Sequence, residues 1–531
     1  MASTASPTMD GAPPANPAAM SEKVDPKRLL AFFIMVCGMF MSILDIQVVS
    51  ASLSDIQAGL SASSQEVSWV QTAYLIAEVI AIPLSGFLSR ALGTRLLFAI
   101  SAAGFTAASF MCGLTSTIEQ MILWRAIQGF LGAGMIPTVF ASAYTIFPRS
   151  KLPLVTPIIG LVATLAPTIG PTVGGYITDL MSWHWLFFIN VVPGIAITIG
   201  VLILIDFDQP NFKLLEHFDW WGLISMAGFL GALEYVLEEG PQYEWFQDTS
   251  VFVCGIICAV SAVAFFYRVL TAREPIVDIR AFTDRNFALG STFSFCVGIG
   301  LYGLTYMYPR YLAEVRGYSA VMIGETMFVS GAAMFLTAPL VGKLMTKIDM
   351  RIMIAAGLIL FAIGSWQMTW ITKEFDFYEL LWPQIFRGCG IMMAMIPVNN
   401  IALGTLPPER LKNASGLFNL TRNLGGAVGL AVINQVLDDR TDLHISRLQD
   451  RVNWGNSMAV ETLNNFTQKF EGMGDASLMA LKQLSLIVHR QAVVMGFGDA
   501  FLILTYFYLA LSVLVFFVNK PNLLGPPPDA H

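Results

Sequence analysis

The feature that most constrains this chain is a succession of long apolar segments, each bounded by charged or turn-forming residues. A helix needs roughly 20 apolar residues to cross about 30 Å of hydrocarbon, and an irregular segment cannot cross because its backbone groups would find no hydrogen-bond partners there. The pattern therefore predicts about fourteen membrane-spanning helices. Their approximate ranges are 29–52, 67–89, 95–115, 118–146, 153–180, 185–205, 220–239, 249–270, 287–312, 320–345, 351–372, 379–405, 413–437 and 497–518.

Composition agrees with a protein that lies in a bilayer. Only 13% of the 531 residues are charged and 55% are hydrophobic, whereas a soluble globular protein carries about 25% charged residues. Too little polar surface remains to cover a water-soluble domain of this length. We therefore expect the chain to be surrounded by lipid and to have no nucleic-acid partner.

Residue types that build metal or nucleotide sites are sparse. The six cysteines all fall inside apolar segments, where they are predicted to be small core hydrophobes. Cys254 and Cys258 share a helix face, but no His or acid lies near them in the sequence. The phosphate-binding pattern Gly-x-x-x-x-Gly-Lys does not occur, and the five histidines form no ligand set. These observations argue against an enzyme or an ATP-driven pump, and we expect neither a metal nor a cofactor.

Basic residues gather on one side of the predicted helices, and this sets their orientation. If the N-terminus is cytoplasmic, the short outer loops hold only Arg316 and Lys373. The inner loops then carry Arg90, Arg95, Arg149, Lys151, Lys213, Arg268, Arg273, Arg280, Arg285, Lys343, Lys347, Arg351, Arg410, Lys412 and Lys520. Because cytoplasmic loops are enriched in Lys and Arg, both termini are predicted to be cytoplasmic. The long segment 438–495 then lies outside, as a helical and partly amphipathic cap.

Three sequence echoes indicate an internal repeat. The segment 83–95, PLSGFLSRALGTR, returns 256 residues later as PLVGKLMTKIDMR. MIPTVFASAYTIFP, at 135–148, resembles MIPVNNIALGTLPP, at 395–408, and a fainter glycine pattern links helix five to helix thirteen. Helices one to six thus recur as nine to fourteen in the same orientation, as in the two halves of rocking transporters. The alternative is a chance likeness between apolar helices rich in Gly and Pro.

The repeat divides the chain into an all-α arrangement of two six-helix bundles and two inserted helices. The predicted units are a disordered tail at 1–28, an N-terminal bundle at 29–206, an inserted pair at 207–285, a C-terminal bundle at 286–520 that includes the outer loop 438–495, and a tail at 521–531.

Charged residues within the spans need a reason, because each costs roughly 2.5–3.5 kcal/mol at the bilayer centre. The arginines are Arg125, Arg310, Arg387 and Arg422, and the acids are Asp45, Glu78, Glu234 and Glu325, with Asp499 near a helix end. By rise per residue, Asp45 and Arg125 lie at similar depth in the outer half. We predict that Asp45, Glu78 and Glu234 take part in proton coupling, with Arg125 as counter-charge. The alternative is a structural ion pair. Arg310 and Glu325 are predicted to be a static pair or snorkelling helix ends rather than a proton relay.

Other side chains are candidates for a substrate cavity and for a pivot. Polarizable side chains adapt to varied ligands. The predicted lining residues are Met39, Tyr74, Tyr302, Tyr306, Phe418, Asn419 and Arg422. Each could instead pack against lipid or a neighbouring helix. In helix five, Gly170, Gly174 and Gly175 permit close helix contact, while Pro167 and Pro171 permit a bend.

Four motifs resemble a known family. They are LDIQVVSASLSDI at 44–56, RAIQGFLGAG at 125–134 with Arg125, Gln128 and Gly129, GLVATLAPTIGPTVGG at 160–175, and WHWLFFINVVPG at 183–194. The chain resembles the fourteen-helix drug:proton antiporters of the major facilitator superfamily, EmrB/QacA type, and most of all EmrB. The resemblance implies a major facilitator fold and multidrug efflux driven by a proton gradient. The alternatives are a proton-coupled exporter or permease of one metabolite, uptake in place of export, and a non-transporting receptor or scaffold.

The resemblance also implies partners, and it has departures. EmrB-like pumps lie in the bacterial inner membrane and work with a periplasmic adaptor (EmrA-like) and an outer-membrane channel (TolC-like). In the loop motif, Gly86, Gly93 and Arg95 fit, but Arg90 stands where the family has Asp, so an acid gate at that position is not expected. Gln47 replaces a usual Thr in the first-helix motif and is a candidate for substrate selection.

Overall fold

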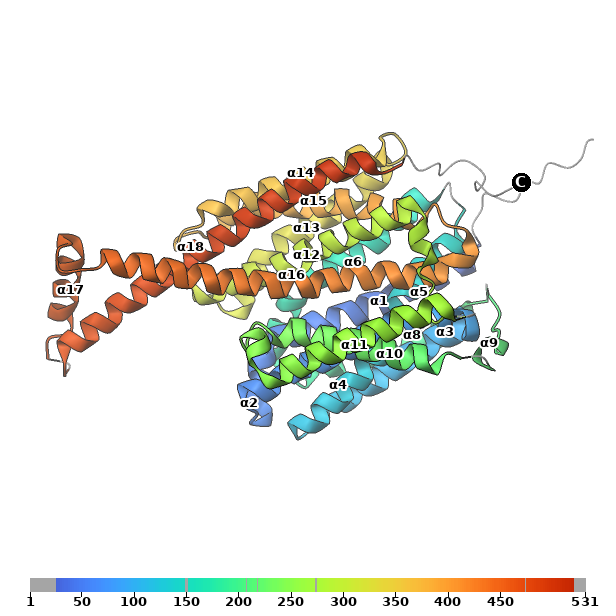
Figure 1. Ribbon diagram of the computed structural model, residues 1–531, viewed down its shortest axis with the longest axis horizontal. Coiled ribbons are helices and arrows are strands. Elements are labelled where there is room, and N and C mark those ends of the chain that lie inside the picture. The colour runs from blue at the N-terminus through green and yellow to red at the C-terminus, as the bar shows by residue number, and fades with distance from the viewer. Residues whose placement is uncertain are drawn as a thin grey trace, which may run out of the picture.

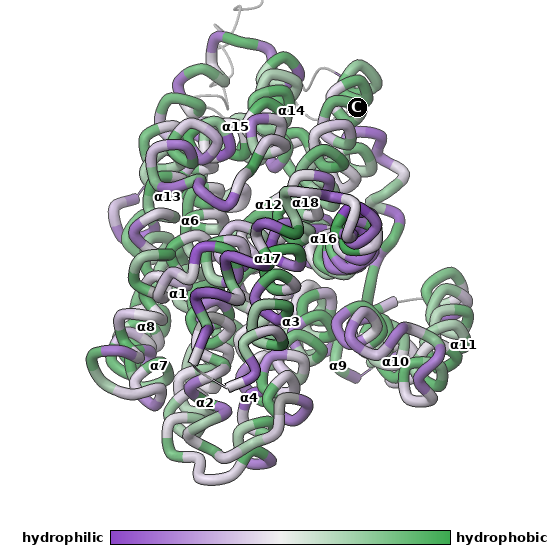
Figure 2. The backbone as a smooth tube through the Cα atoms, turned by 90° about the vertical axis from the view of Figure 1, so that its left-hand side faces the viewer, coloured by the Kyte–Doolittle hydropathy of each residue, from purple (hydrophilic) through white to green (hydrophobic). Residues whose placement is uncertain are grey.

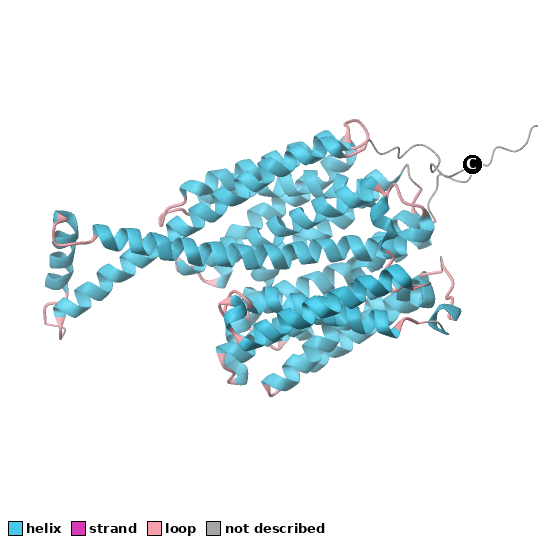
Figure 3. Cartoon of the chain, viewed as in Figure 1, coloured by secondary structure: helices cyan, strands magenta, loops and turns pink. Residues whose placement is uncertain are grey.

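The computed structural model describes residues 25–148, 151–206, 208–216, 218–272, 275–472 and 474–519, and within these ranges the chain is helical apart from short connections (Figure 3). The predicted tails lie outside the described residues, except that helix α1 already begins at Pro26. Asp25 caps this helix by accepting a hydrogen bond from the Lys27 amide, and proline is favoured at a first helical position. Arg149, Arg273 and Lys520, which contributed to the predicted orientation, also lie outside.

The helices follow one another along the chain with short turns (Figure 1). Most of them begin at a Ser, Thr or Asp whose side chain accepts a backbone N–H, as Thr117, Asp284 and Ser319 do. The elements are α1 Pro26–Ala51, α2 Leu53–Leu60, α3 Ser64–Cys112, α4 Ile118–Gly132, α5 Met135–Ile146, α6 Leu152–Leu180, α7 Trp185–Phe188, α8 Val191–Leu204, α9 Lys213–Glu216, α10 Trp220–Glu239, η3 Trp245–Gln247, α11 Thr249–Thr271, η4 Ile279–Thr283, α12 Arg285–Glu314, α13 Ala320–Leu344, α14 Met350–Gln367, η5 Met368–Trp370, α15 Phe377–Leu403, α16 Pro408–Arg451, α17 Ser457–Lys469, α18 Ala476–Leu514 and η6 Val515–Phe517.

Twelve helices of the described residues are long and apolar enough to cross a membrane. One of them, α3, contains a break at Gly93, where φ is +75° and ψ is 160°, so it supplies two of the predicted spans. Helix α16 is not among the twelve because it carries many charges, but it packs along α12 and α18 as a span would. Counted this way, the described helices agree with the prediction of about fourteen spans.

Two predicted segments differ from the structure in their details. The predicted span 118–146 is divided into α4 and α5 at Ala133 and Gly134. The predicted outer loop 438–495 is almost entirely helical, because α16 continues to Arg451, α17 follows, and α18 starts at Ala476. These helices project from the bundle at the left of Figure 1. We call this projection the extension, and we call the side of the bundle from which it projects the extension end.

Two pairs of helices make the largest contacts between the halves, and α5 with α16 and α6 with α15 add smaller ones. Helix α6 packs on α13, and α3 packs on α16. In the predicted repeat, helix two corresponds to helix ten and helix five to helix thirteen, so the repeat exchanges these two contacts. A pseudo-symmetric interface of this kind is what two parallel repeats produce. Of the inserted pair, α10 packs on α3 and α16, whereas α11 packs on α10 at the edge of the molecule (Figure 2). Only 11% of the apolar stretch of α11 is buried.

We predict that Gly129→Ala destabilises the N-terminal half. A Cβ at this position would lie 2.4 Å from the carbonyl oxygen of Tyr74, so α3 and α4 would have to separate. Overpacking of this kind typically costs about 1–3 kcal/mol. Thermal unfolding of the detergent-purified protein measures the effect. Gly331→Ala is the control, because its nearest atom, Cδ1 of Leu165 at 3.1 Å, ends a flexible side chain. Equal melting temperatures for wild type and Gly129→Ala would contradict the prediction.

Candidate functional site

The N-terminal half encloses an ion pair between Asp45 on α1 and Arg125 on α4. Nη1 of Arg125 donates to Oδ2 of Asp45 at 2.6 Å, and both side chains are 0% exposed. The other carboxylate oxygen accepts hydrogen bonds from Asn190 at 2.7 Å and Gln128 at 3.1 Å. Gln128 in turn accepts from Arg125 at 2.9 Å. Asp45 therefore has polar partners on both oxygens, as a buried carboxylate requires.

Further contacts hold Arg125 in place. Its Nε donates to the carbonyl oxygen of Val70 at 3.1 Å, and its guanidinium lies 4.2 Å from the ring centroid of Tyr74. The close approach of α3 and α4 at Gly129 brings these groups within reach. Nη2 of Arg125 has no hydrogen-bond partner among the described residues. The pair is thus nearly but not completely satisfied, and it lies inside one half of the molecule.

The second half contains the corresponding arginine without an acid. Arg387, on the predicted counterpart of α4, is 1% exposed, and its Nη2 donates to Oγ1 of Thr305 at 3.2 Å. Its guanidinium lies 5.4 Å from the ring centroid of Tyr308, and its Nε and Nη1 have no hydrogen-bond partner in the described part of the chain. Thr305 lies on α12, the predicted counterpart of α1. Each half therefore has a buried arginine on corresponding helices, and only the arginine of the first half is paired with a carboxylate.

A second group of charges spans the interface between the halves. Glu78 on α3 is 2% exposed and interacts electrostatically with Arg422 on α16, which is also 2% exposed, and with Arg125. Glu234 on α10 is 5% exposed and interacts with Glu78. One carboxylate oxygen of each glutamate has no hydrogen-bond partner among the described residues. Glu78 thus links the buried ion pair of one half to a buried cation of the other.

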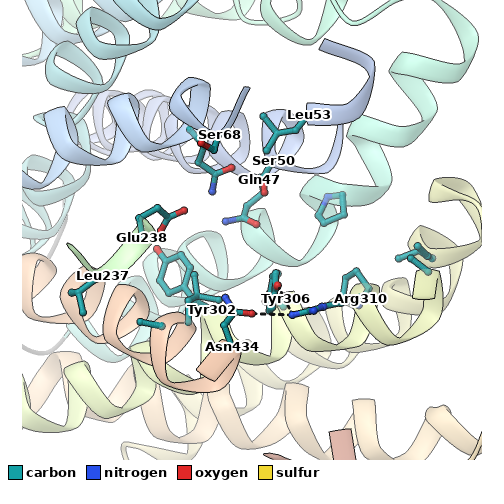
Figure 4. A pocket seen from close by; sticks show the side chains of 18 residues that line it. Gln47, Ser50, Leu53, Ser68, Leu237, Glu238, Tyr302, Tyr306, Arg310 and Asn434 are labelled. Carbon is teal, nitrogen blue, oxygen red and sulfur yellow. Dashed lines mark hydrogen bonds between the residues drawn. The ribbon is translucent and has the colours of Figure 1, made fainter. Parts of the chain in front are cut away.

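A cavity of about 510 Å³ lies between the halves at the extension end (Figure 4). Helices α1, α3 and α6 line one side, α12, α13 and α16 line the other, and α10 adds a third wall. The lining residues are Gln47, Ser50, Leu53, Ser68, Gln71, Pro171, Leu237, Glu238, Tyr302, Thr305, Tyr306, Pro309, Arg310, Ala313, Ile323, Leu430, Ala431 and Asn434. Within the described residues, no three His, Cys, Asp or Glu side chains gather as metal ligands would.

The structure separates the predicted substrate residues into two groups. Gln47, Tyr302 and Tyr306 line the cavity. The remaining ones are buried away from it: Met39, Tyr74, Phe418, Asn419 and Arg422. Asn419 donates to the carbonyl oxygen of Ser415, and Arg422 lies over the ring of Phe140. These contacts assign both side chains to helix packing and to the interface charges rather than to the cavity wall.

Two charged residues of the cavity wall were misjudged or missed in the sequence. The predicted pair of Arg310 and Glu325 does not form, because Arg310 bonds to Glu314 at 2.8 Å, one turn away on the same helix, while Glu325 accepts from Tyr176 at 3.4 Å. Glu238 was not singled out, although it stands four residues after Glu234 and therefore on the same face of α10.

The end of the bundle opposite the extension is closed by contacts between the halves. Lys412 on α16 bonds to Asp208 and donates to the carbonyl oxygen of Ser89 at 3.0 Å. Asp208 also accepts from the Thr94 amide at 2.9 Å, just after the break at Gly93. Asp208 therefore supplies an acid at the loop where Arg90 replaces the expected Asp. The sequence could not show this, because Asp208 lies in a different segment.

The other residues singled out in the segment 83–95 lie in three different environments. A Cβ at Gly86 would meet the backbone of Lys412 and Asn413 at 3.0 Å, so the glycine permits the halves to touch. The guanidinium of Arg90 lies 5.6 Å from the Phe87 ring centroid, and Arg95 is exposed.

Helix α6 combines close contacts with prolines. A Cβ at Gly170 would lie 2.3 Å from Cβ of Gln47, which places α6 directly against the part of α1 that lines the cavity. Gly174 approaches Val48 in the same way, while Gly175 and Pro167 are buried and Pro171 lines the cavity. Helix α6 is continuous through its three internal prolines, so a pivot at these residues would be a bend of α6 itself rather than a break between two helices.

Comparison with known proteins places this geometry in a family. Residues 35–430 match the family model of the Major Facilitator Superfamily. The chain is 41% identical over 490 residues to the colistin resistance protein EmrB of Acinetobacter baumannii, covering 92% of this chain and 96% of that protein. It is 29% identical to the multidrug export protein EmrB of Escherichia coli, covering 91% and 93%.

A solved structure shows the same fold at low sequence identity. The crystal structure of the human organic anion transporter MFSD10 (TETRAN) matches with a TM-score of 0.57 and 12% identity, covering 91% of this chain and all of that one. The chain therefore belongs to the Major Facilitator Superfamily, as an EmrB-type secondary transporter rather than an enzyme.

Proposed function

We propose that this chain exports hydrophobic and amphipathic toxic compounds in exchange for protons by alternating access. The observation that carries the proposal is the fully buried Asp45–Arg125 pair in one half, opposite an arginine that lacks an acid in the other. Ionisable residues inside a membrane protein are costly, and they commonly mark ion or substrate pathways. The names of relatives, multidrug export protein and colistin resistance protein, support efflux as the direction.

The proposed coupling step begins at Asp45. Protonation would remove the charge that balances Arg125, and an unbalanced buried charge costs several kcal/mol. Arg125 also interacts with Glu78, which faces Arg422 on the other half. A change of charge at Asp45 therefore alters the attraction between α3 and α16, the helices that join the halves. Glu234 extends the same group of acids toward the cavity.

The proposed cycle uses the state seen in the structure as its outward-facing form. The cavity lies at the extension end, and Lys412 and Asp208 close the opposite end. Loss of that contact and closure at the extension end would expose the cavity to the other side. For a neutral substrate, one proton moved through 100 mV yields about 2.3 kcal/mol, or roughly fifty-fold accumulation, whereas one-for-one exchange with a monovalent cation is electroneutral and would use only the pH gradient.

The proposal includes a location and partners. We place the chain in the inner membrane of a Gram-negative bacterium, with both termini in the cytoplasm and the extension in the periplasm. The extension is a protruding helical structure of suitable position for an EmrA-like adaptor that leads to a TolC-like channel. The proton gradient serves as the energy source, and no cofactor takes part.

We predict that Asp45→Asn abolishes substrate-induced proton movement. The amide keeps the shape of the side chain but cannot carry the exchanged proton. Proteoliposomes with an internal pH dye measure proton movement when substrate is added. Asp55→Asn, an exposed position on α2, is the control and should behave as wild type.

The alternative explanation is loss of folding, because Asp45→Asn leaves Arg125 unbalanced. The double variant Asp45→Asn with Arg125→Gln removes both charges and tests this possibility. We expect it to fold, to bind substrate and still to move no protons. Full proton coupling in either variant would remove Asp45 from the mechanism.

We predict that Asp208→Asn shifts the transporter toward the form open at the end opposite the extension. The substitution removes the charge that holds Lys412 and the start of the helix after Gly93. Hydrogen bonds to charged groups contribute about 1.5–3 kcal/mol, which corresponds to a shift of roughly 10- to 150-fold in the conformational equilibrium.

The measurement is the labelling rate of a single cysteine placed at Ser85, which is buried on α3 near the contact. Asp206→Asn, whose exposed carboxylate pairs with Lys27, serves as the control. Exchange of the charges in Asp208→Lys with Lys412→Asp should partly restore the wild-type rate. An unchanged rate in Asp208→Asn would show that this contact does not hold the end closed.

A further inference from the structure

The inserted helix α10 is fastened to both halves beside the cavity. On one side, Glu239 accepts hydrogen bonds from Thr72 at 2.9 Å and Ser68 at 3.3 Å, both on α3. On the other side, Nε1 of Trp245, just after α10, donates to Oε1 of Gln435 on α16 at 2.6 Å. The last turns of α10 therefore bridge the two halves, and Leu237 and Glu238 face the cavity between them.

Glu238 is the one acid that lines this cavity among the described residues. Its side chain is half-buried and turns toward the space between Gln47 and Tyr302 (Figure 4). It forms no ion pair in the described part of the chain, and the nearest charge is Glu239, which has the same sign and is already bonded to Thr72. The carboxylate is thus available to a ligand.

The charges around the cavity do not compensate Glu238. Arg310 is the cationic side chain of the lining, but it is engaged by Glu314 at 2.8 Å, Tyr306 at 2.9 Å and Asn434 at 3.0 Å. The helices α1, α3, α6 and α13 contribute neutral side chains to the wall. Deeper in the interface, Glu234 adds a buried acid with an unbonded oxygen. Because Arg310 is paired with Glu314, the unpaired charge of the cavity wall is negative, and a partly enclosed site of this kind concentrates cations.

We infer that Glu238 selects cationic amphipathic substrates, so that the inserted pair of helices forms part of the substrate site. The carboxylate would face the cationic group, while Tyr302 offers an aromatic ring to the same part of the ligand; the ring of Tyr306 already lies under the Arg310 guanidinium. Leu237, Ile323 and Leu430 supply apolar surface for its hydrophobic portion. The inference rests on the proposed transport function for its biological meaning, but the binding preference itself can be measured separately.

The test compares two ions of nearly the same shape and opposite charge. Binding of tetraphenylphosphonium and of tetraphenylborate to the detergent-purified full chain is measured by titration calorimetry, with no proton gradient present. Wild type should prefer the cation. Glu238→Gln should weaken binding of the cation about tenfold, as loss of a nearby charge in a partly screened site does. Binding of the anion should stay the same or become tighter.

Two variants show whether the effect belongs to the charge at this position. Glu238→Asp should retain the preference for the cation. Glu461→Gln removes one acid from an exposed position on α17 and should bind both ions as wild type does. The inference is overturned if Glu238→Gln binds the cation as tightly as wild type, if it loses both ions equally, or if wild type has no preference. Cation binding that depends on Glu238, with no proton-driven transport, would instead contradict the proposed function.

Discussion

The structure depends on the high free-energy cost of an unpaired charge in the hydrocarbon of the membrane. Arg125 is completely buried, and it remains there because Asp45, Gln128, Val70 and Tyr74 surround it from three helices. Removal of one partner from such a group leaves a charge that the membrane cannot solvate. The ion pair therefore holds α1, α3 and α4 together, and the same cost makes it sensitive to a proton. Stability and function are expected to act through one set of contacts.

Duplication explains why this sensitivity is confined to one half. The C-terminal half repeats the helices and has a buried arginine at Arg387, but this arginine bonds to Thr305 on α12, whereas Arg125 bonds to Asp45 on α1. Two titrating copies would change the charge of both halves together and would not distinguish them. In the proposed mechanism, protonation of this one acid would change the charge of one half only, and Glu78, which interacts with both Arg125 and Arg422, would carry the effect to the interface.

Much of this architecture follows from the sequence, because span length and repeats are local properties. The halves and the buried charges were predicted from segment length and from the echoes at 83–95 and 339–351. Contacts between distant segments were not. Asp208 supplies the acid that is missing at Arg90, and Arg310 pairs with Glu314 instead of Glu325. Tertiary packing determines which carboxylate lies beside each basic group. The extension was predicted as a helical cap, but its charges concealed that α16 and α18 continue into it without a break.

The inserted segment contacts both halves of the molecule, and this bears on how the halves can move. A helix tied only to one half would travel with it, but α10 bonds to α3 through Glu239 and to α16 through Trp245. When the halves rock, the distance between these two anchors must change, so at least one of the hydrogen bonds has to break or α10 has to tilt. Helix α11 packs on α10 and otherwise faces outward, which leaves the pair free to tilt as a unit. In the proposed cycle, the wall that carries Glu238 would therefore change when the halves move, and a ligand bound there would lose part of its site.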